Sequence, residues 1–362
     1  MRITYILDIF GGGGKERRCL QLIQGLNNRG YYDIQVIIID NKVSYPELYD
    51  TTAKIEIIDR KNNGFCQIKI AQVLHRLLKD FKPDIVQAWG LMSAGLVLLA
   101  NPFAKFRFLA SYVADCDIPH GLKGIVNHIC NRVCIKIISN SKAGLLAYKT
   151  PASKSVLIYN GYNEARFNNV VDKEFKKGQL AINTKYVVAM VASFWQNKDW
   201  QCYIDAAKKI IESRQDITFL AVGNGPQWEH YNRQVKDNER EYIKMTGRRD
   251  DIDEIYQICD LTVLTSTHGE GISNSIMESM AWGVPVIATN KGGTPEIIED
   301  DMNGKLINEQ TSDEVSRMIT SLIDAPIKLA QMGKNAAETI QREFLLHRMT
   351  DNYIKLYKEI CK

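Results

Sequence analysis

The stretch of residues 261–308 constrains the fold of this chain most strongly, because two kinds of hydrophobic pattern alternate within it. Residues 261–266 are apolar and rich in β-branched side chains, which predicts a buried strand that runs into the polar, glycine-containing turn 267–271. Residues 274–282 then take up helical spacing and stop at Gly283. A second strand and the start of a second helix follow, so the sequence predicts a strand–helix–strand–helix unit of an α/β protein.

Two carboxylates flank the first turn of this unit. Glu270 lies in the loop after the first strand, and Glu278 lies about one turn into the helix. The N-terminus of a helix suits a phosphate, because its N–H groups and the positive end of its dipole face the anion. A diphosphate there would have one acid near each end to accept hydrogen bonds from sugar or ribose hydroxyls. The alternative is structural: Glu278 closes a capping box with Ser275, and Glu270 is a solvated loop residue.

The residues around the two acids carry a resemblance to a known family. In order, the chain shows Glu-x7-Glu, Ala-x-Gly-x-Pro-Val-Ile-Ala-Thr, Gly-Gly-x-Pro-Glu-Ile-Ile and Asn-Gly. This ordered series closely resembles the donor-binding segment of the retaining glycosyltransferases of family four, the glycosyl transferases group 1. The resemblance implies the GT-B fold, in which two Rossmann-like, doubly wound α/β domains face each other across a cleft. It also implies a nucleotide-diphosphate sugar donor and no metal requirement.

The same resemblance assigns roles to individual residues of this segment. It gives the ribose to Glu278 and the donor sugar to Glu270, which is expected to orient the sugar during catalysis. It places the donor phosphates at the backbone N–H groups of four consecutive residues, Gly271, Ile272, Ser273 and Asn274. It leaves the nucleophile of a retaining transfer unassigned.

Length and composition favour a globular protein of two domains. The 362 residues are enough for two separate cores, and a composition of 45% hydrophobic and 24% charged residues is typical of globular proteins. The net charge of +4 is too small to indicate nucleic acid as a partner. The eight cysteines form no Cys-x-x-Cys pair and no zinc-ligand pattern, which favours buried cysteines over a metal site and predicts a reducing cytoplasm. The family resemblance implies that no metal and no cofactor is needed beyond the nucleotide-sugar substrate. The apolar segments are too short to cross a bilayer.

A strand, a glycine loop and a helix open the chain. Residues 3–9 predict a buried strand, and residues 15–29 have helical periodicity that stops at Gly30. Glycines between a strand and a helix let backbone N–H groups approach an anion, although the loop lacks the Gly-x-Gly-x-x-Gly and P-loop fingerprints. By resemblance, Gly13 and Gly14 belong to the loop that faces the donor across the cleft.

Two later segments are candidates for the acceptor side. Residues 83–89 predict a strand that ends at Trp89, and this side chain either shapes an acceptor pocket or belongs to the core. His120 lies in a polar loop after the strand predicted at 108–113, and by resemblance it is the candidate that contacts the sugar. Asp115 is the alternative contact in the same loop.

Residues 122–136 predict a helix that mixes basic and apolar side chains. Lys123, His128 and Arg132 alternate there with apolar residues such as Ile125 and Ile129. Such a helix is a candidate surface for anionic membrane, and the alternative is an ordinary amphipathic helix that faces the core.

The second half of the chain contains a lysine placed for phosphate binding. Lys198 stands between a predicted strand and a predicted helix, where its charge can neutralise a diphosphate. The family carries an arginine five or three residues before this lysine, but the present chain has Ser193 and Trp195 at those positions. Arg248 and Arg249, in a loop that resembles the family's nucleobase-pocket loop, are candidates to supply the missing charge.

These patterns predict four segments. They are an N-terminal acceptor-binding domain at 1–168, a polar linker at 169–184, a donor-binding domain at 185–344 and a terminal helix at 345–362 that packs back on the first domain.

We therefore predict a metal-independent retaining glycosyltransferase of the hexosyltransferase type. The expected donor is a UDP-sugar rather than a GDP-sugar, and the expected acceptor is a hydroxyl of a saccharide or lipid-linked saccharide in surface polysaccharide biosynthesis, such as lipopolysaccharide or capsule. The expected location is the cytoplasm, with peripheral contact to the inner face of the membrane. One alternative, motivated by the missing arginine, is a non-catalytic nucleotide-sugar-binding relative that partners another transferase. A second is a dinucleotide-dependent oxidoreductase, for which Asp40 is the only plausible ribose acid.

Overall fold

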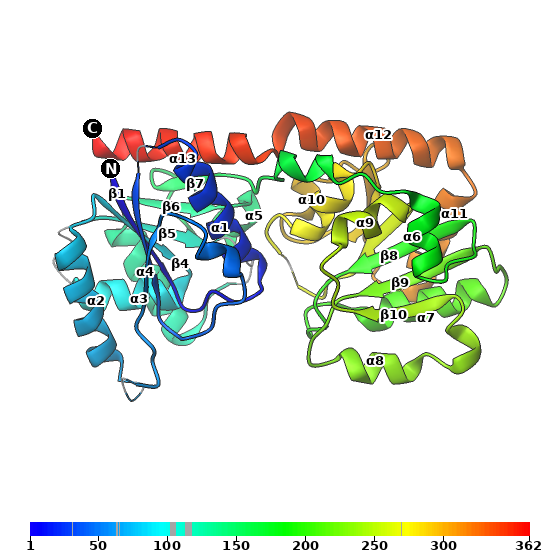
Figure 1. Cartoon of the computed structure of the whole chain (residues 1–362), viewed down its shortest axis with the longest axis horizontal. Helices are drawn as coiled ribbons and strands as arrows, with labels where there is room; N and C mark the ends of the chain where they lie inside the picture. The colour runs from blue at the N-terminus through cyan, green and yellow to red at the C-terminus, as the bar shows by residue number, and fades with distance from the viewer. Residues whose placement is uncertain (31, 63, 65, 102–105, 113–117, 269) are drawn as a thin grey trace. The chain divides into compact units, whose positions relative to one another are not determined.

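The computed structural model of the chain describes residues 1–362 except 31, 63, 65, 102–105, 113–117 and 269. The chain forms two compact units: unit 1 comprises Met1–Asn163 and Leu346–Lys362, and unit 2 comprises Glu164–Leu345. Each unit is an α/β body in which helices cover both faces of one parallel sheet (Figure 1). The prediction of two Rossmann-like α/β domains is confirmed.

Among the described residues of unit 1, the sheet has seven parallel strands in the order β3-β2-β1-β4-β5-β6-β7. The strands are β1 (Arg2–Leu7), β2 (Asp33–Ile38), β3 (Lys54–Ile57), β4 (Ile85–Trp89), β5 (Arg107–Tyr112), β6 (Lys136–Ser139) and β7 (Ser155–Leu157). The helices are α1 (Gly14–Asn27), α2 (Gln67–Phe81), α3 (Leu91–Ala100), α4 (Gly121–Val133), α5 (Lys142–Ala147), α13 (Leu346–Cys361) and the 3-10 helix η1 (Pro46–Leu48). The order changes direction between β1 and β4, which is the switch point of a doubly wound sheet.

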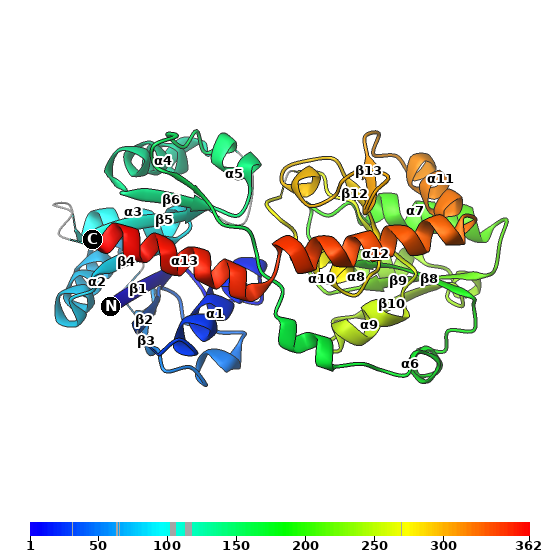
Figure 2. The same cartoon turned by 90° about the horizontal axis from the view of Figure 1, so that it is seen from above.

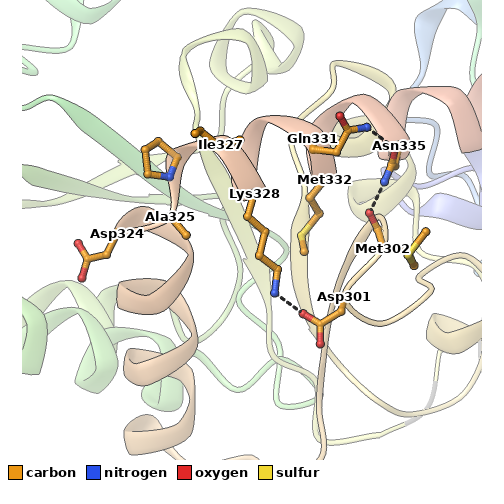
Figure 3. Close-up of a pocket in the computed structure, with 10 residues that line it drawn as sticks. Asp301, Met302, Asp324, Ala325, Ile327, Lys328, Gln331, Met332 and Asn335 are labelled. Atoms are coloured by element: carbon orange, nitrogen blue, oxygen red, sulfur yellow. Dashed lines mark hydrogen bonds and ion pairs between the residues drawn. The ribbon is translucent and has the colours of Figure 1, made fainter.

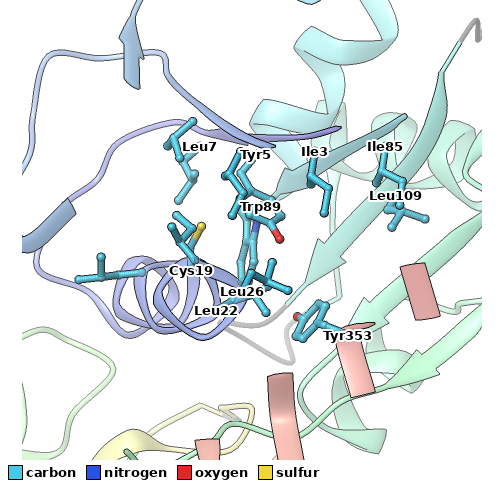
Figure 4. Packing of buried hydrophobic residues seen from close by; sticks show 14 of the residues in the cluster. Ile3, Tyr5, Leu7, Cys19, Leu22, Leu26, Ile85, Trp89, Leu109 and Tyr353 are labelled. Atoms are coloured by element: carbon cyan, nitrogen blue, oxygen red, sulfur yellow. The ribbon is translucent and has the colours of Figure 1, made fainter. Parts of the chain in front are cut away.

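The two faces of this sheet bury separate cores. Strands such as β1 and β4 are buried almost throughout, as expected for parallel strands covered on both sides. One face packs against α1 and α13, and the other against α2, α3 and α4. Figure 4 shows Trp89 inside the first core. The centroid of its ring lies 6.0 Å from that of Tyr5 and 6.4 Å from that of Tyr353. Trp89 is fully buried, so it belongs to the core and not to an acceptor pocket.

The C-terminal helix is part of unit 1. In α13, Tyr357 donates a hydrogen bond of 2.6 Å to the Gln87 side chain, and its hydroxyl lies 3.0 Å from that of Tyr5. The helix also packs against α1, and the two ends of the chain lie close together in this unit (Figure 2). The last helix therefore completes a core that the N-terminal strands begin.

Among the described residues of unit 2, the sheet has six parallel strands in the order β10-β9-β8-β11-β12-β13. The strands are β8 (Tyr186–Val191), β9 (Ile217–Val222), β10 (Ile243–Gly247), β11 (Leu261–Leu264), β12 (Val286–Thr289) and β13 (Gly304–Ile307). The helices are α6 (Lys173–Gln179), α7 (Trp200–Ile211), α8 (Trp228–Gln234), α9 (Ile252–Ile258), α10 (Asn274–Ala281), α11 (Ser312–Ile323) and α12 (Pro326–Glu343), with the 3-10 helices η2 (Glu164–Asn168), η3 (Asp237–Glu239) and η4 (Thr294–Glu296). The switch point lies between β8 and β11.

Two segments differ from the sequence expectation. Residues 169–184, expected as a linker, contain α6, which begins because the Asp172 side chain accepts hydrogen bonds from two backbone N–H groups of its first turn. This helix packs against α9 and so belongs to unit 2. The helix expected at 122–136 ends at Val133, because Lys136 already pairs with β5 as the first residue of β6.

Candidate functional site

Two loops at the switch point of unit 2 lie side by side. One follows β8 and the other follows β11, and they are joined by a bridge between Lys198 and Ser266. Asp199 N–H donates to the Thr265 carbonyl at 3.0 Å, and Thr267 N–H donates to the Asn197 carbonyl at the same distance. In open α/β sheets, ligands bind beyond the carboxyl ends of the strands at this point. The topology therefore places the predicted Lys198 where a ligand is expected.

Lys198 and Glu270 form an ion pair in these loops. The lysine is 8% exposed, and its ammonium contacts Glu270 Oε1, which also accepts a hydrogen bond of 3.1 Å from Ser266 Oγ. The Glu270 backbone carbonyl accepts from Gly293 N–H at 2.6 Å, which ties the loop to the turn after β12. The alternative of a solvated Glu270 is wrong, because this carboxylate is held by a buried cation.

A narrow pocket adjoins this ion pair. Its lining residues are Leu264, Ser266, His268, Glu270, Thr289, Lys291 and Thr294. Lys291 donates a hydrogen bond of 3.1 Å to the Thr267 carbonyl, so a second cation stands at the same edge of the sheet. Lys291 was not predicted as a site residue, although its place two residues after the end of β12 was a usable signal.

The N-terminus of α10 lies at the end of the β11 loop. Gly271 and Ile272 are buried, and Ser273 is the N-cap residue without a side-chain capping bond. Asn274 is the first helical residue and is half-buried. The four residues predicted to hold phosphate thus form the entry to a helix whose positive dipole end faces the loop.

Glu278 takes part in a second buried ion pair of unit 2. It is 5% exposed, and its Oε1 accepts a hydrogen bond of 2.7 Å from Arg166 of η2. The capping-box alternative is wrong, because the N-cap is Ser273, and Ser275 lies inside the first turn with its hydroxyl 3.0 Å from that of Ser273. Arg166 was not predicted as a site residue, and it stands 112 residues before its partner.

The arginines after β10 are held by neighbouring carboxylates. Arg249 Nε donates to Asp251 Oδ1 at 2.8 Å, and Lys176 contacts the same carboxylate. Hydrogen bonds from these two cations, Arg249 first, hold the pKa of Asp251 well below its usual range. Arg248 is exposed and lies 3.6 Å from Asp250. Ser193 and Trp195, at the family's arginine positions, are both exposed.

Three predicted site residues belong to unit 1. Gly13 is the N-cap of α1 and Gly14 is its first residue, and a Cβ on Gly13 would lie 2.5 Å from Glu16 Oε2. His120 is the exposed N-cap of α4, and its side chain makes no capping bond. Asp115, the alternative sugar contact, lies outside the described residues.

A charged cluster at the switch point of unit 1 was not predicted. Asp8 follows β1, and Gly90 follows β4 with a φ of 121°. A Cβ at Gly90 would lie 3.8 Å from both Asp8 Oδ2 and the Lys15 ammonium. Burial raises the pKa of Asp8, and the charges of Lys15 and Arg60 oppose that rise. This cluster occupies in unit 1 the place that Lys198 and Glu270 occupy in unit 2.

The helix α4 presents an apolar stripe to solvent. Leu122 is 72% exposed and Ile125 is 59% exposed, and Ile129 and Val133 continue the stripe at four-residue spacing. The alternative of an ordinary core-facing helix is therefore wrong for these residues. Within the described part of the chain, no helix combines the length and apolar character needed to cross a membrane. The same described residues contain no cluster of three or more His, Cys, Asp or Glu side chains suited to a metal ion.

A larger surface pocket of unit 2 contains none of the predicted site residues. Figure 3 shows it between the start of α12 and the loop at Asp301 and Met302. Lys328 is ion-paired with Asp301 at 2.8 Å, and the Asn335 side chain donates to the Met302 carbonyl at 2.8 Å. With these polar groups already paired, the pocket has no constellation that indicates catalysis.

Comparison with known proteins relates this geometry to a family. Residues 172–339 match the family described as "Glycosyl transferases group 1". A relative in Escherichia coli, "UDP-Gal:alpha-D-GlcNAc-diphosphoundecaprenol alpha-1,3-galactosyltransferase", is 29% identical over 302 residues, which cover 78% of this chain and 77% of the relative. The "lipopolysaccharide core biosynthesis glycosyltransferase LpsE" of Rhizobium meliloti is 23% identical and covers 98% of both chains. The crystal structure of Anabaena HepE in complex with UDP-glucose has the same fold, with a TM-score of 0.88, 20% identity and coverage of 99% of this chain and 100% of that chain.

Proposed function

This chain is a glycosyltransferase of the GT-B fold whose second unit carries the glycosyl transferases group 1 domain, and we propose that it transfers a sugar from a UDP-sugar with retention of configuration. The acceptor that we propose is a hydroxyl of a saccharide or lipid-linked saccharide in surface polysaccharide assembly. In the reaction, the bond between the anomeric carbon and the diphosphate breaks, and the acceptor oxygen bonds to that carbon while its proton is released.

The observation that carries this proposal is the pairing of Lys198 with Glu270 at the switch point of unit 2. An ammonium has three hydrogen atoms to donate, so Lys198 can contact a diphosphate oxygen while it still contacts Glu270. We propose that it stabilises the charge that builds on the leaving diphosphate, together with the N-terminus of α10. Glu270 would orient the donor sugar, and Glu278 would bind the ribose. This arrangement uses a side-chain cation and backbone dipoles, so we propose transfer that persists in the presence of a chelator.

The relatives support the choice of donor and acceptor. The E. coli relative is named for UDP-Gal and for an acceptor linked to diphosphoundecaprenol, and the Anabaena structure holds UDP-glucose. The Rhizobium relative is named for lipopolysaccharide core biosynthesis. These names favour a uridine nucleotide over a guanosine nucleotide and an acceptor with a lipid diphosphate.

The surface of α4 supports peripheral contact with an anionic membrane as part of this function. Its exposed apolar stripe is flanked by the exposed basic residues Lys123 and Arg132. Residues 118–163 contain six lysines and arginines and no aspartate or glutamate. An apolar stripe beside basic side chains binds anionic lipid surfaces. We propose that α4 holds the enzyme at the cytoplasmic face of the membrane, where a lipid-linked acceptor is found.

The proposal is tested by ligand binding and by the stereochemistry of the product. Thermal unfolding with UDP, GDP, ADP and NAD at millimolar concentration should show a stabilising shift with UDP, because a ligand of the native state raises its melting temperature. Transfer from a UDP-sugar in the presence of EDTA, followed by NMR, should give a product with the anomeric configuration of the donor. A shift with GDP alone or a product of inverted configuration would contradict the proposal.

A further inference from the structure

Arg166 joins the first residues of unit 2 to the proposed ribose carboxylate. It lies in η2, and its guanidinium forms a fork on Asp253 of α9, with Nε donating to Oδ2 at 2.9 Å and Nη2 donating to Oδ1 at 2.6 Å. Its remaining terminal nitrogen, Nη1, donates to Glu278 Oε1 at 2.7 Å. One guanidinium therefore connects two acids of different helices.

The three side chains are largely withdrawn from water. Their exposed fractions are 15% for Arg166, 13% for Asp253 and 7% for Glu278. Burial by itself lowers the pKa of Arg166, but the negative charge of Glu278 and the bonds to Asp253 outweigh it and raise the pKa above its ordinary value. The arginine thus stays charged, and a bidentate pair holds its plane in one orientation.

A further contact holds Asp253 in place. Trp282, at the end of α10, donates its indole N–H to Asp253 Oδ1 at 2.9 Å. The ring of Trp282 packs edge-on against Phe167, the residue after Arg166, with centroids 5.8 Å apart. Asp253 therefore accepts hydrogen bonds from both Arg166 and Trp282, and this contact holds the Arg166 guanidinium that donates to Glu278.

We infer that Arg166 is a positioning residue that fixes the Glu278 carboxylate in the orientation that binds the donor ribose. The inference rests on the proposed function, since it assumes that Glu278 binds ribose hydroxyls. A carboxylate has about four acceptor sites, and the hydrogen bond from Arg166 uses one of them and restricts the rotation of the group. A carboxylate already held in place loses less conformational freedom when the ribose binds.

A positioning role and a purely structural ion pair differ in one measurable property. If Arg166 acts through Glu278, its loss weakens the binding of nucleotides that have ribose hydroxyls and leaves the binding of analogues without them unchanged. If the ion pair only supports the fold, its loss weakens both kinds of ligand alike. The probes are UDP and 2′,3′-dideoxy-UDP, with binding measured by calorimetry on the full chain.

We expect the parent enzyme to bind UDP about tenfold more tightly than the dideoxy analogue, because a site built for hydroxyls rejects a ligand that lacks them. Arg166→Gln should weaken UDP binding about tenfold and leave the analogue within about twofold. Arg166→Lys should keep part of the preference. The double variant Arg166→Gln with Glu278→Gln should bind UDP no more weakly than Glu278→Gln alone, since the two changes act through the same interaction between Glu278 and the ribose.

Trp282→Phe provides a second variant in case Arg166→Gln does not fold. It keeps an aromatic ring against Phe167, removes the hydrogen bond to Asp253 and should lower the preference for UDP by a smaller factor. The inference is overturned if Arg166→Lys and Trp282→Phe both keep the full preference, or if the variants weaken both ligands equally. A parent enzyme that binds UDP and the analogue equally also overturns it, while the proposed function stands. A parent enzyme that binds no nucleoside diphosphate overturns the proposed function itself.

Discussion

The two units share the order of their first six strands but differ in the chemistry at the switch points of their sheets. After β8 and β11 of unit 2, Lys198 and Glu270 form a buried ion pair beside a helix N-terminus. After β1 of unit 1, Asp8 is partly buried near Lys15, and its Oδ1 has no hydrogen-bond partner among the described residues. The shared topology determines where a ligand can bind, and the loop residues determine which ligand it is.

The largest expected effect tests the donor site that we propose at the switch point of unit 2. Lys198→Ala should lower kcat/KM for transfer about 100-fold, because the change removes the cation that we propose stabilises the leaving diphosphate. Glu278→Ala should lower it at least about tenfold through weaker binding of the donor. Steady-state assays with a UDP-sugar measure both effects, and circular dichroism checks the fold of each variant.

A lysine of the same unit provides the matched control. Lys328 pairs with Asp301 at 2.8 Å on the surface, and its loss should leave transfer within about twofold of the parent, because exposed ion pairs contribute little. Unchanged turnover in both Lys198→Ala and Glu278→Ala would show that the donor site has been assigned to the wrong residues.

The donor segment was predictable because its signals are local. The strand at 261–264 and the helix at 274–281 follow from periodicity over a few residues, and both lie within two residues of their expected ends. The partners of Glu270 and Glu278 were not predictable in the same way, because Lys198 and Arg166 stand 72 and 112 residues away in sequence. The spacing from Ser275 to Glu278 also fits a capping box, so the sequence left open whether Glu278 caps the helix. The observed N-cap at Ser273 excludes the capping box.

The acceptor side was less predictable for a related reason. The exposed stripe of α4 and a core-facing stripe have the same helical spacing, so the sequence left both alternatives open until the exposure of Ile125 was known. Asp8 gave no signal, because a lone acid after a strand is common. Its significance depends on Lys15 and Gly90, which the fold brings to the same edge of the sheet.

The second effect tests whether unit 1 carries the proposed membrane surface. The double variant Leu122→Ser with Ile125→Ser should reduce co-sedimentation with vesicles of phosphatidylcholine and phosphatidylglycerol about tenfold, because two exposed apolar side chains are removed. Its activity on a water-soluble acceptor should stay unchanged. The control is Ile327→Ser in unit 2, which removes a side chain that is 87% exposed. An equal loss of co-sedimentation in the two variants would contradict the proposed membrane surface on α4. Binding of the parent enzyme to vesicles of pure phosphatidylcholine that is as strong as its binding to the mixed vesicles would also contradict it.

The third effect tests the glycine loop of unit 1. A Cβ at position 13 would lie 2.5 Å from the carboxylate of the buried Glu16, so Gly13→Ala must displace that side chain. We expect transfer to fall about fivefold, since this loop is predicted to face the donor and small displacements near a reacting ligand reduce rates. Gly12→Ala is the matched control, because its nearest neighbour would be Ser44 Cβ at 3.9 Å. If Gly12→Ala loses as much activity as Gly13→Ala, the close approach of position 13 to Glu16 does not explain the loss.

The smallest effect concerns Asp8 at the switch point of unit 1, and it is measured as the pH dependence of the melting temperature. Burial raises the pKa of Asp8, with Lys15 and Arg60 opposing the rise, so ionised Asp8 destabilises the folded state. This penalty is absent below the unfolded pKa of about 4, grows as the pH rises through the folded pKa, and is then constant. Asp8→Asn removes the penalty, so its melting temperature should equal that of the parent near pH 4 and exceed it by on the order of 2 °C at neutral pH. The exposed Asp50 provides the control, since Asp50→Asn should follow the parent at every pH. If Asp8→Asn instead melts below the parent at neutral pH, the attraction between Asp8 and Lys15 outweighs burial, and the switch point of unit 1 is stabilised by ion pairing as that of unit 2 is.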